Sequence, residues 1–378
     1  MATAERLAPG VIRDGIIRVL MGASRPLTTK EIEDELGSKL GSISGSSVRS
    51  YLQLNTPGTF TRTGRGTYCL AEMEDSFREP STDYDGFAHF DIGKATLFHA
   101  DCLDWLRVQQ ANSIHAVVTD PPYGLFEYSE EQQEKLRSGS GGVWRIPPSF
   151  DGSTRSPLPR FTTLTQAQIE EIEAFFLSWG RLVLDKVVPG ANVVVASNPL
   201  LSHIVAYALS SAGLERRGEI IRLTMTMRGG DRPKDAHEEF ADISVMPRSM
   251  WEPWVLFRKP VEGRVQDNLR KWGTGGFRRP SKDRPFGDVI ESSPTRAAER
   301  KLAPHPSLKP QDFMRKLVRG VLPLGVGVVC DPFAGSGSTL AAANAVGYSS
   351  IGVEKDRTYF DLAKESIGKL SQFTAGAL

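Results

Sequence analysis

Residues 117–124 place a carboxylate, a stiff backbone and an aromatic ring directly after an apolar stretch. They read VVTDPPYG and contain Asp120, Pro121, Pro122 and Tyr123. Proline has no N–H and a fixed φ, so the turn is rigid and its carbonyl groups point in set directions. If the apolar stretch is a strand, these groups lie at its carboxyl end, where ligands bind in open α/β sheets. We predict a ligand-binding turn; the alternative is an ordinary strand-ending turn capped by the aspartate.

A glycine-rich turn lies nearer the end of the chain. Residues 328–343 read VVCDPFAGSGSTLAAA, in which a strand ends at Cys330 and a helix follows the glycines. Gly335 and Gly337 let the backbone approach a ligand, and the helix N-terminus offers N–H groups to a carboxylate or phosphate. A second strand ends at Glu354, an acid placed to accept hydrogen bonds from ribose hydroxyls. A nicotinamide-nucleotide site is the alternative, although G-x-G-x-x-G is missing, and the lack of a Walker lysine counts against ATP hydrolysis.

Two further segments complete a set of four motifs. HPSLKPQDFMRKLV, residues 305–318, precedes the glycine-rich strand, and LFHADCLDWL, residues 97–106, precedes the DPPY segment. Together the four motifs resemble those of the DNA amino-methyltransferases, which methylate the exocyclic amine of adenine or cytosine. Their order along the chain resembles the circularly permuted beta class of that family. The resemblance covers residues 93–370.

The resemblance implies a role for each motif. DPPY lines the pocket of the target base, and the glycine-rich turn holds S-adenosylmethionine. Asp101 lies near the cofactor's adenine, Glu354 binds its ribose, and the HPxxKP segment covers part of it. The implied catalytic residues are Asp120, Pro121, Pro122 and Tyr123. The implied cofactor-binding residues are Asp101, Asp120, His305, Lys309, Asp331, Pro332, Phe333, Ala334, Gly335, Ser336, Gly337, Ser338, Thr339 and Glu354.

The expected chemistry starts from a poor nucleophile, because the lone pair of an exocyclic amine is delocalised into the base. Asp120 and the carbonyl of Pro121 would accept the two amine hydrogens, which localises the lone pair, while Tyr123 stacks on a base flipped out of the duplex. We expect a site-specific DNA methyltransferase acting on adenine N6, since Asp before the two prolines leans toward adenine. Cytosine N4 is the alternative, and a winged-helix DNA-binding regulator with an inactive methyltransferase domain is the second. No metal-ligand cluster appears, so no metal is expected.

Strands and helices alternate from residue 93 onward, which predicts an α/β domain over residues 93–378 with a mostly parallel sheet covered on both faces. The resemblance makes this a Rossmann-like, circularly permuted, seven-stranded sheet. The expected strands are residues 95–99, 116–119, 192–196, 219–225, 254–258, 326–330 and 350–353. The expected helices are residues 166–188, 200–212, 310–321, 339–346 and 359–370.

Two segments interrupt this pattern. Residues 124–165 are rich in glycine and proline, and we expect an active-site loop that closes over the flipped base. Residues 260–304 hold ten Lys and Arg against six Asp and Glu, and the beta class places its target-recognition insert there. Basic side chains in such an insert contact phosphates or guanine edges, and a solvated basic loop is the alternative. The predicted DNA-binding residues are Arg270, Lys271, Arg278, Arg279, Lys282 and Arg284.

Residues 1–75 are predicted to form a separate domain of three helices and a hairpin. Thr28 and Glu31 are spaced as a helix-capping box, and the hairpin surrounds Gly64 and Gly66. This is the winged helix-turn-helix pattern, and RPLTTKEIEDEL and RTGRGTYCL resemble winged-helix domains attached to some bacterial restriction and modification enzymes. DNA contact and a role in dimerisation or regulation both stay open.

Composition excludes several other classes of protein. The 378 residues carry 46 basic and 45 acidic side chains, which excludes a histone-like or wholly acidic chain, so any DNA surface must come from local clustering. Three distant cysteines fit a reducing compartment, and neither a signal-type start nor a membrane-length apolar run is present. Residues 76–92 are expected to be a linker. We expect a cytoplasmic protein, bacterial or phage and nucleoid-associated, with double-stranded DNA as partner; a homodimer and a separate cognate restriction endonuclease stay open.

Overall fold

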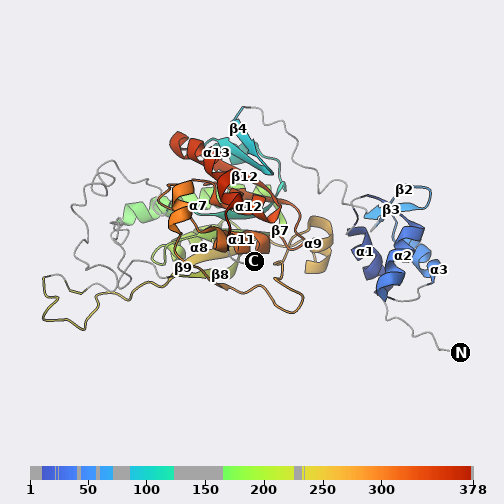
Figure 1. The fold of residues 1–378 in the computed structure, drawn as a ribbon, viewed down its shortest axis with the longest axis horizontal. Helices are drawn as coiled ribbons and strands as arrows, with labels where there is room; N and C mark the ends of the chain where they lie inside the picture. Colours follow the sequence, from blue (N-terminus) through green and yellow to red (C-terminus); the bar gives the residue numbers. More distant parts are fainter. Residues whose placement is uncertain are drawn as a thin grey trace. The chain divides into compact units, whose positions relative to one another are not determined.

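The computed structural model describes residues 11–21, 23, 25–40, 44–56, 60–70, 86–122, 165–224, 232–233 and 235–375. Tyr123 and the predicted active-site loop, except Thr165, lie outside these residues. The chain divides into two compact units, Met1–Thr82 and Asp83–Leu378 (Figure 1). None of the described helices is both long and apolar enough to cross a membrane.

The first unit contains the three helices and the hairpin expected from the sequence, with one additional short strand. Its strands form an antiparallel sheet in the order β1-β3-β2, and Ile16, Ile32, Val48 and Phe60 are fully buried between helices and sheet. The capping box is present, because the Thr28 N–H donates to Glu31 (2.7 Å) and the Glu31 N–H donates to the Thr28 hydroxyl (3.3 Å). The elements are α1 Val11–Met21, β1 Leu27–Thr28, α2 Thr29–Leu40, α3 Gly45–Leu54, β2 Phe60–Gly64 and β3 Thr67–Leu70.

The second unit is built on one nine-stranded sheet with the order β10-β8-β9-β7-β6-β11-β12-β5-β4. The five strands from β7 to β5 are parallel, as expected, while β9 is antiparallel to both of its neighbours and β4 is antiparallel to β5. The strands are β4 Ala88–Ile92, β5 Ala95–His99, β6 Ile114–Thr119, β7 Val187–Ala196, β8 Glu215–Leu223, β9 Trp251–Arg258, β10 Val289–Glu291, β11 Val328–Asp331 and β12 Ser349–Glu354.

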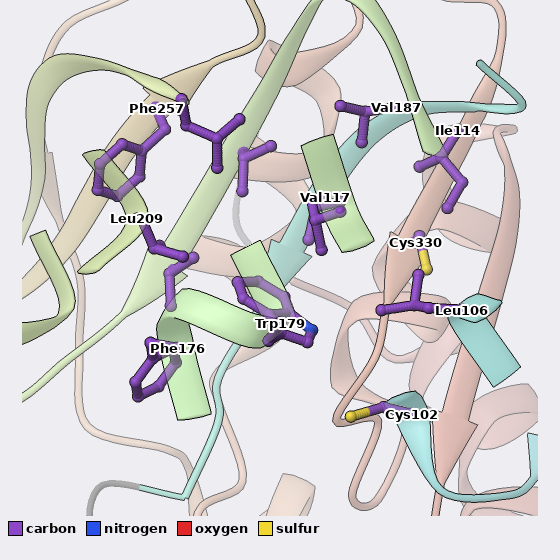
Figure 2. Packing of buried hydrophobic residues seen from close by; sticks show 14 of the residues in the cluster. Cys102, Leu106, Ile114, Val117, Phe176, Trp179, Val187, Leu209, Phe257 and Cys330 are labelled. Atoms are coloured by element: carbon purple, nitrogen blue, oxygen red, sulfur yellow. The ribbon is translucent and has the colours of Figure 1, made fainter. Parts of the chain in front are cut away.

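Helices cover both faces of this sheet. On one face α7 and α8 pack around Trp179, and Figure 2 shows Phe176 and Leu209 on the same side as Val117 of β6. On the other face Phe313 of α11 packs against Trp254 of β9, with ring centroids 5.3 Å apart. The helices are α5 Cys102–Val108, α7 Gln166–Lys186, α8 Ser202–Ser211, α9 Val265–Trp272, α10 Ala297–Leu302, α11 Gln311–Val321, α12 Ser338–Val346 and α13 Arg357–Gln372.

The sheet corrects the expected count of seven strands, because the two outermost strands, β10 and β4, were not predicted. Strand β4 lies at residues 88–92, inside the predicted linker, and it turns into β5 through Gly93 at a φ of +65°. Four of its five residues are exposed, so it lacks the apolar run that revealed the inner strands. Strand β10 has only three residues and lies inside the predicted recognition insert.

Strand direction defines two opposite edges of the sheet. The carboxyl ends of β5, β6, β7, β11 and β12 form one edge, called the carboxyl edge below, and their starts form the amino edge. Strand β9 begins at the carboxyl edge and ends at the amino edge, because Trp254 pairs with Ala196 and Arg258 pairs with Asn192. Strands β8 and β10 run with β7 and therefore end at the carboxyl edge.

Candidate active site

The DPPY segment begins where β6 ends at the carboxyl edge. All six residues of β6 are buried, and Asp120 and Pro121 follow directly in half-buried and buried positions. The Asp120 Oδ2 atom lies 2.9 Å from the Lys309 Nζ atom, and 16% of the aspartate side chain is exposed. The turn therefore presents a carboxylate paired with a cation, while Pro122 is exposed beside it.

A buried hydrogen bond connects this strand to the glycine-rich one. The Thr119 hydroxyl at the end of β6 donates to the Asp331 Oδ1 atom at the end of the neighbouring β11, at 2.6 Å. The Phe333 N–H donates to the same oxygen at 3.1 Å. Burial, with a smaller contribution from the nearby Asp120 carboxylate, raises the pKa of Asp331 to about 6. Asp331 thus holds the two motifs together at one edge of the sheet.

Glu354, the predicted ribose acceptor, lies directly under the glycine-rich turn. Its Oε2 atom accepts from the Gly335 N–H at 2.7 Å, and its Oε1 atom accepts from the Asp356 N–H at 2.8 Å. Burial raises the pKa of Glu354 to about 7, and the Asp331 and Asp356 carboxylates add to that rise. A buried acid with a raised pKa at a ligand-binding edge is typical of a functional site.

The two glycines of the turn serve different purposes. Gly335 has a φ of +51°, and a Cβ atom there would lie 3.2 Å from the His305 ring, so the ring packs closely on the turn and a side chain at this position would press against it. Gly337 has a φ of +81°, and its Cβ would lie 2.3 Å from Cγ1 of Ile367. Gly337 is therefore required for the packing of the turn against α13.

The remaining turn residues are mostly inside the protein. Phe333 is half-buried and packs against Trp179, with ring centroids 5.9 Å apart. Thr339 donates a side-chain hydrogen bond that lowers the pKa of Asp331, which opposes the effect of burial. The buried members of the turn are Pro332, Ala334, Ser336, Gly337, Ser338 and Thr339, so the half-buried Phe333 and Gly335 are the predicted turn residues open to a ligand.

His305 lies above this turn as a neutral imidazole. Burial lowers its pKa to about 4, with a further contribution from the Lys309 ammonium. The Ser307 N–H donates to Nδ1 at 3.1 Å, so Nε2 carries the ring proton. The ring also contacts Tyr359 edge-on, with centroids 4.4 Å apart. A fixed N–H donor therefore lies next to Gly335.

Asp101, predicted to meet the adenine, begins α5 at the carboxyl edge of β5. Its Oδ1 atom accepts from the Leu103 N–H at 2.8 Å, which caps the helix, and Oδ2 pairs with Lys355 at 3.0 Å. The Ala100 N–H donates to the Glu354 carbonyl at 3.1 Å, so Asp101 lies one strand away from Glu354. The side chain of Asp101 is 32% exposed and remains open to solvent.

Lys309 was predicted as a cofactor-binding residue of the covering segment, and the structure gives its ammonium two acidic contacts. It lies 2.8 Å from Glu252 Oε1 as well as 2.9 Å from Asp120 Oδ2. Glu252 in turn accepts from Arg222 at 3.0 Å. Sequence reasoning missed both Glu252 and Arg222. No local signal marked them, because β8 carries several other charged residues and Glu252 meets Lys309 only in the folded sheet.

Three of the predicted DNA-binding residues lie at the amino edge, opposite Asp120. They follow β9, which ends at that edge, and the buried Asn268 of α9 fastens the segment by donating to the Pro189 carbonyl at 2.9 Å. This placement argues against base recognition by these side chains, which have intramolecular partners: Arg270 with Asp267 at 2.8 Å, Lys271 with Glu262 at 2.8 Å, and Arg278 with the Tyr348 hydroxyl at 2.7 Å.

The rest of the predicted recognition insert returns to the carboxyl edge. Arg279, Lys282 and Arg284 are exposed along the way. After β10, the Ser292 N–H donates to the Leu223 carbonyl at 3.1 Å, which places residues 292–304 at the same edge as Asp120. This part contains α10 and further exposed basic side chains. Among the described residues, no cluster of three His, Cys, Asp or Glu could hold a metal ion.

The sequence is similar to those of known DNA methylases. The family model described as DNA methylase, N6_N4_Mtase, matches residues 114–365, two thirds of the chain. Type II methyltransferase M.HindIII of Haemophilus influenzae is 23% identical over 72% of this chain and 94% of its own. The solved PvuII DNA methyltransferase (cytosine-N4-specific) is 15% identical, covers 73% of this chain and 91% of its own, and has a TM-score of 0.46. The M1.HpyAVI-SAM complex is 17% identical, covers 71% and 98%, and has a TM-score of 0.43.

The chain belongs to the N6/N4 DNA methylase family, because the family model spans both the DPPY turn and the glycine-rich turn. S-adenosyl-L-methionine is the methyl donor of this family. The two turns that the sequence singled out are thus adjacent in the fold and lie within one family match.

Proposed function

We propose that this chain is a site-specific DNA methyltransferase that transfers a methyl group from S-adenosylmethionine to the N6 amine of adenine in a flipped-out base. The observation that carries the proposal is the 2.6 Å hydrogen bond from Thr119 to Asp331, which ties the DPPY strand to the glycine-rich strand at one edge. The aspartate of the DPPY turn favours adenine. Cytosine N4 is the alternative, since the amine of either base has two hydrogens for the same two acceptors.

The residues at the carboxyl edge fit S-adenosylmethionine. A side chain at position 335 would press against the His305 ring, and Glu354 offers a half-buried carboxylate to ribose hydroxyls. Gly335, His305, Glu354 and Asp101 would hold the cofactor. When bound, the cofactor supplies an electrophilic methyl group.

The protein's part in the reaction is to make the base amine nucleophilic and to aim it. The Asp120 carboxylate and the Pro121 carbonyl accept the two amine hydrogens and so localise the nitrogen lone pair. Positive charge grows on the nitrogen during the transfer, and a fixed carboxylate stabilises that charge more in the transition state than in the ground state. Holding the amine in line with the methyl group supplies much of the remaining acceleration.

The same arrangement supports the circularly permuted order. The glycine-rich strand β11 lies at the centre of the sheet between β6 and β12, although it follows seven other strands of that sheet in the chain. In this proposal the chain forms β4 and β5 first, at one side of the sheet. The cofactor-binding strand β11 is the second-last strand to be formed, before β12.

DNA recognition is proposed for the part of the insert that reaches the carboxyl edge. Arg296, Arg300 and Lys301 are exposed there. The exposed Arg279, Lys282 and Arg284 are proposed to contact phosphates, which position the duplex without reading its sequence. Exchanging residues 289–304 for those of a related enzyme should change the methylated site. An unchanged site in methylome sequencing would count against this assignment.

The first unit is proposed to be a winged helix-turn-helix domain that adds affinity for DNA. Three helices carry a three-stranded sheet, and the hairpin of β2 and β3 exposes Arg62 and Arg65. Basic residues on such a wing suit phosphate contact. A role in association between chains is the alternative.

Substitution of Asp120 tests the proposed chemistry. Asp120→Ala removes the acceptor and should nearly abolish single-turnover methyl transfer at saturating DNA and cofactor. Asp120→Asn keeps one carbonyl oxygen and should retain some activity. If Asp120 instead abstracted a proton, Asn would be as inactive as Ala. Asp104→Asn, on the exposed side of α5, is the matched control and should behave as wild type. A wild-type rate in Asp120→Ala would remove Asp120 from the site.

A further inference from the structure

Four charged side chains form a continuous row from the end of β8 to the DPPY turn. Arg222 Nη1 lies 3.0 Å from Glu252 Oε2, Glu252 Oε1 lies 2.8 Å from Lys309 Nζ, and Lys309 Nζ lies 2.9 Å from Asp120 Oδ2. The charges alternate and cancel. The side chains come from β8, β9, the HPxxKP segment and the end of β6, so no local sequence pattern brings them together.

These four charged side chains are largely removed from water. The side chains of Arg222 and Lys309 are each 10% exposed, Glu252 is 13% exposed and Asp120 is 16% exposed. Buried charges of this kind persist only when they are paired and hydrogen-bonded. Removing one member would leave a net charge on the others in a medium that solvates it poorly.

Arg222, at the end of the row farthest from Asp120, is held rigidly. Arg222 donates through Nε to the Ser292 hydroxyl and through Nη2 to the Ser293 carbonyl, both at 3.1 Å. Its guanidinium also lies 5.5 Å from the centre of the Phe313 ring. With its three nitrogens engaged, the guanidinium fixes the position of Glu252.

Glu252 and Lys309 both stay charged near neutral pH. Burial opposes ionisation of Glu252, but the Lys309 and Arg222 cations lower its pKa to about 2. Burial also opposes the charge of Lys309, while the Asp120 and Glu252 carboxylates raise its pKa overall. Glu252 is therefore a permanent anchor for the ammonium.

We propose that Glu252 is a positioning residue for methyl transfer, which it serves by holding Lys309 between two carboxylates so that the Asp120 carboxylate keeps a fixed position toward the target amine. This inference rests on the proposed function. An ammonium that paired with Asp120 alone would move with it and would neutralise the acceptor that the target amine needs. Shared with Glu252, the ammonium stays in place and Asp120 keeps hydrogen-bonding capacity for the substrate.

Glu252→Gln tests the proposal, with Glu219→Gln as the matched control. Glu219 lies on β8 and pairs with Arg216 at 3.1 Å on the protein surface. We expect the single-turnover methyl-transfer rate of Glu252→Gln to fall at least about tenfold, while calorimetric affinities for S-adenosylmethionine and DNA change less than threefold. Glu252→Gln also removes one of the two carboxylates that raise the pKa of Lys309. The methyl-transfer rate of the variant should therefore fall at an alkaline pH at which the wild-type rate does not.

A second variant separates positioning from charge balance. Arg222→Met combined with Glu252→Gln removes one charge of each sign and leaves the Lys309–Asp120 pair. We expect this double variant to regain the melting temperature lost in Glu252→Gln but to stay slow. A wild-type rate in either folded variant, or recovery of both rate and melting temperature in the double variant, would overturn the proposal. No methyl transfer by wild type would instead refute the proposed function itself.

Discussion

Gly337→Ala is predicted to destabilise the catalytic unit, although its position in the motif suggests a ligand contact. The native φ of +81° is unfavourable for alanine and costs about 1–2 kcal/mol. The new Cβ would lie 2.3 Å from Cγ1 and 2.7 Å from Cδ1 of Ile367, which is fully buried in α13. Overpacking of this kind costs about 1–3 kcal/mol. The free energy of unfolding should therefore fall by about 2–5 kcal/mol.

Denaturant unfolding of wild type, Gly337→Ala, Ile367→Ala and the double variant measures the steric part of this loss of stability. Removing the Ile367 side chain relieves the clash but not the backbone strain, so the double-variant cycle should give a coupling of about 1–3 kcal/mol. Gly335→Ala is the comparison, because its Cβ would meet only the His305 ring at 3.2 Å. It should weaken calorimetric binding of S-adenosylmethionine more than it lowers stability. Unchanged stability with lost cofactor affinity in Gly337→Ala would refute the packing role of this glycine.

Three further predictions concern other contacts. The pKa of Glu354 is raised to about 7, so its carboxylate is protonated as pH falls below that value. The affinity of wild type for S-adenosylmethionine, measured by calorimetry, should therefore weaken by up to about tenfold per pH unit below 7. The affinity of Glu354→Gln should not change over the same pH range. Thr119→Val removes the donor to the buried Asp331 and should lower the free energy of unfolding by about 1–3 kcal/mol. The loss should be smaller at pH 5, where Asp331, with its pKa of about 6, is protonated; an equal loss at both pH values would contradict that ionisation. Arg65→Ala should reduce the slope of log affinity for DNA against log salt by about 0.9, and an unchanged slope would favour the association role of the first unit.

The inner sheet could be predicted because its strands are short apolar runs that end in distinctive residues. Residues 95–99 form β5 as expected, and the runs before Asp120 and Asp331 form β6 and β11. The edge strands could not be predicted, since β4 is mostly exposed and resembles a linker in composition. The positions of the Asp120 carboxylate and the glycine-rich turn follow from the parallel order alone.

The position of three predicted DNA-binding residues at the amino edge has a single physical cause. A fully parallel sheet would have brought residues 260–278 to the carboxyl edge, but β9 runs antiparallel and delivers them to the amino edge. Arg278 therefore packs on Tyr348 instead of facing Asp120. The pairing of Lys309 with Glu252 was equally hidden, because 57 residues separate the two and only the folded sheet brings them together.

The most direct test of the account is nucleoside mass spectrometry of unmethylated DNA incubated with the purified protein and S-adenosylmethionine bearing a deuterated methyl group. The account predicts labelled N6-methyldeoxyadenosine with wild type and almost none with Asp120→Ala. Label in N4-methyldeoxycytidine would contradict the choice of adenine, and the absence of any labelled nucleoside from DNA that contains the recognition site would contradict the proposed methyl transfer.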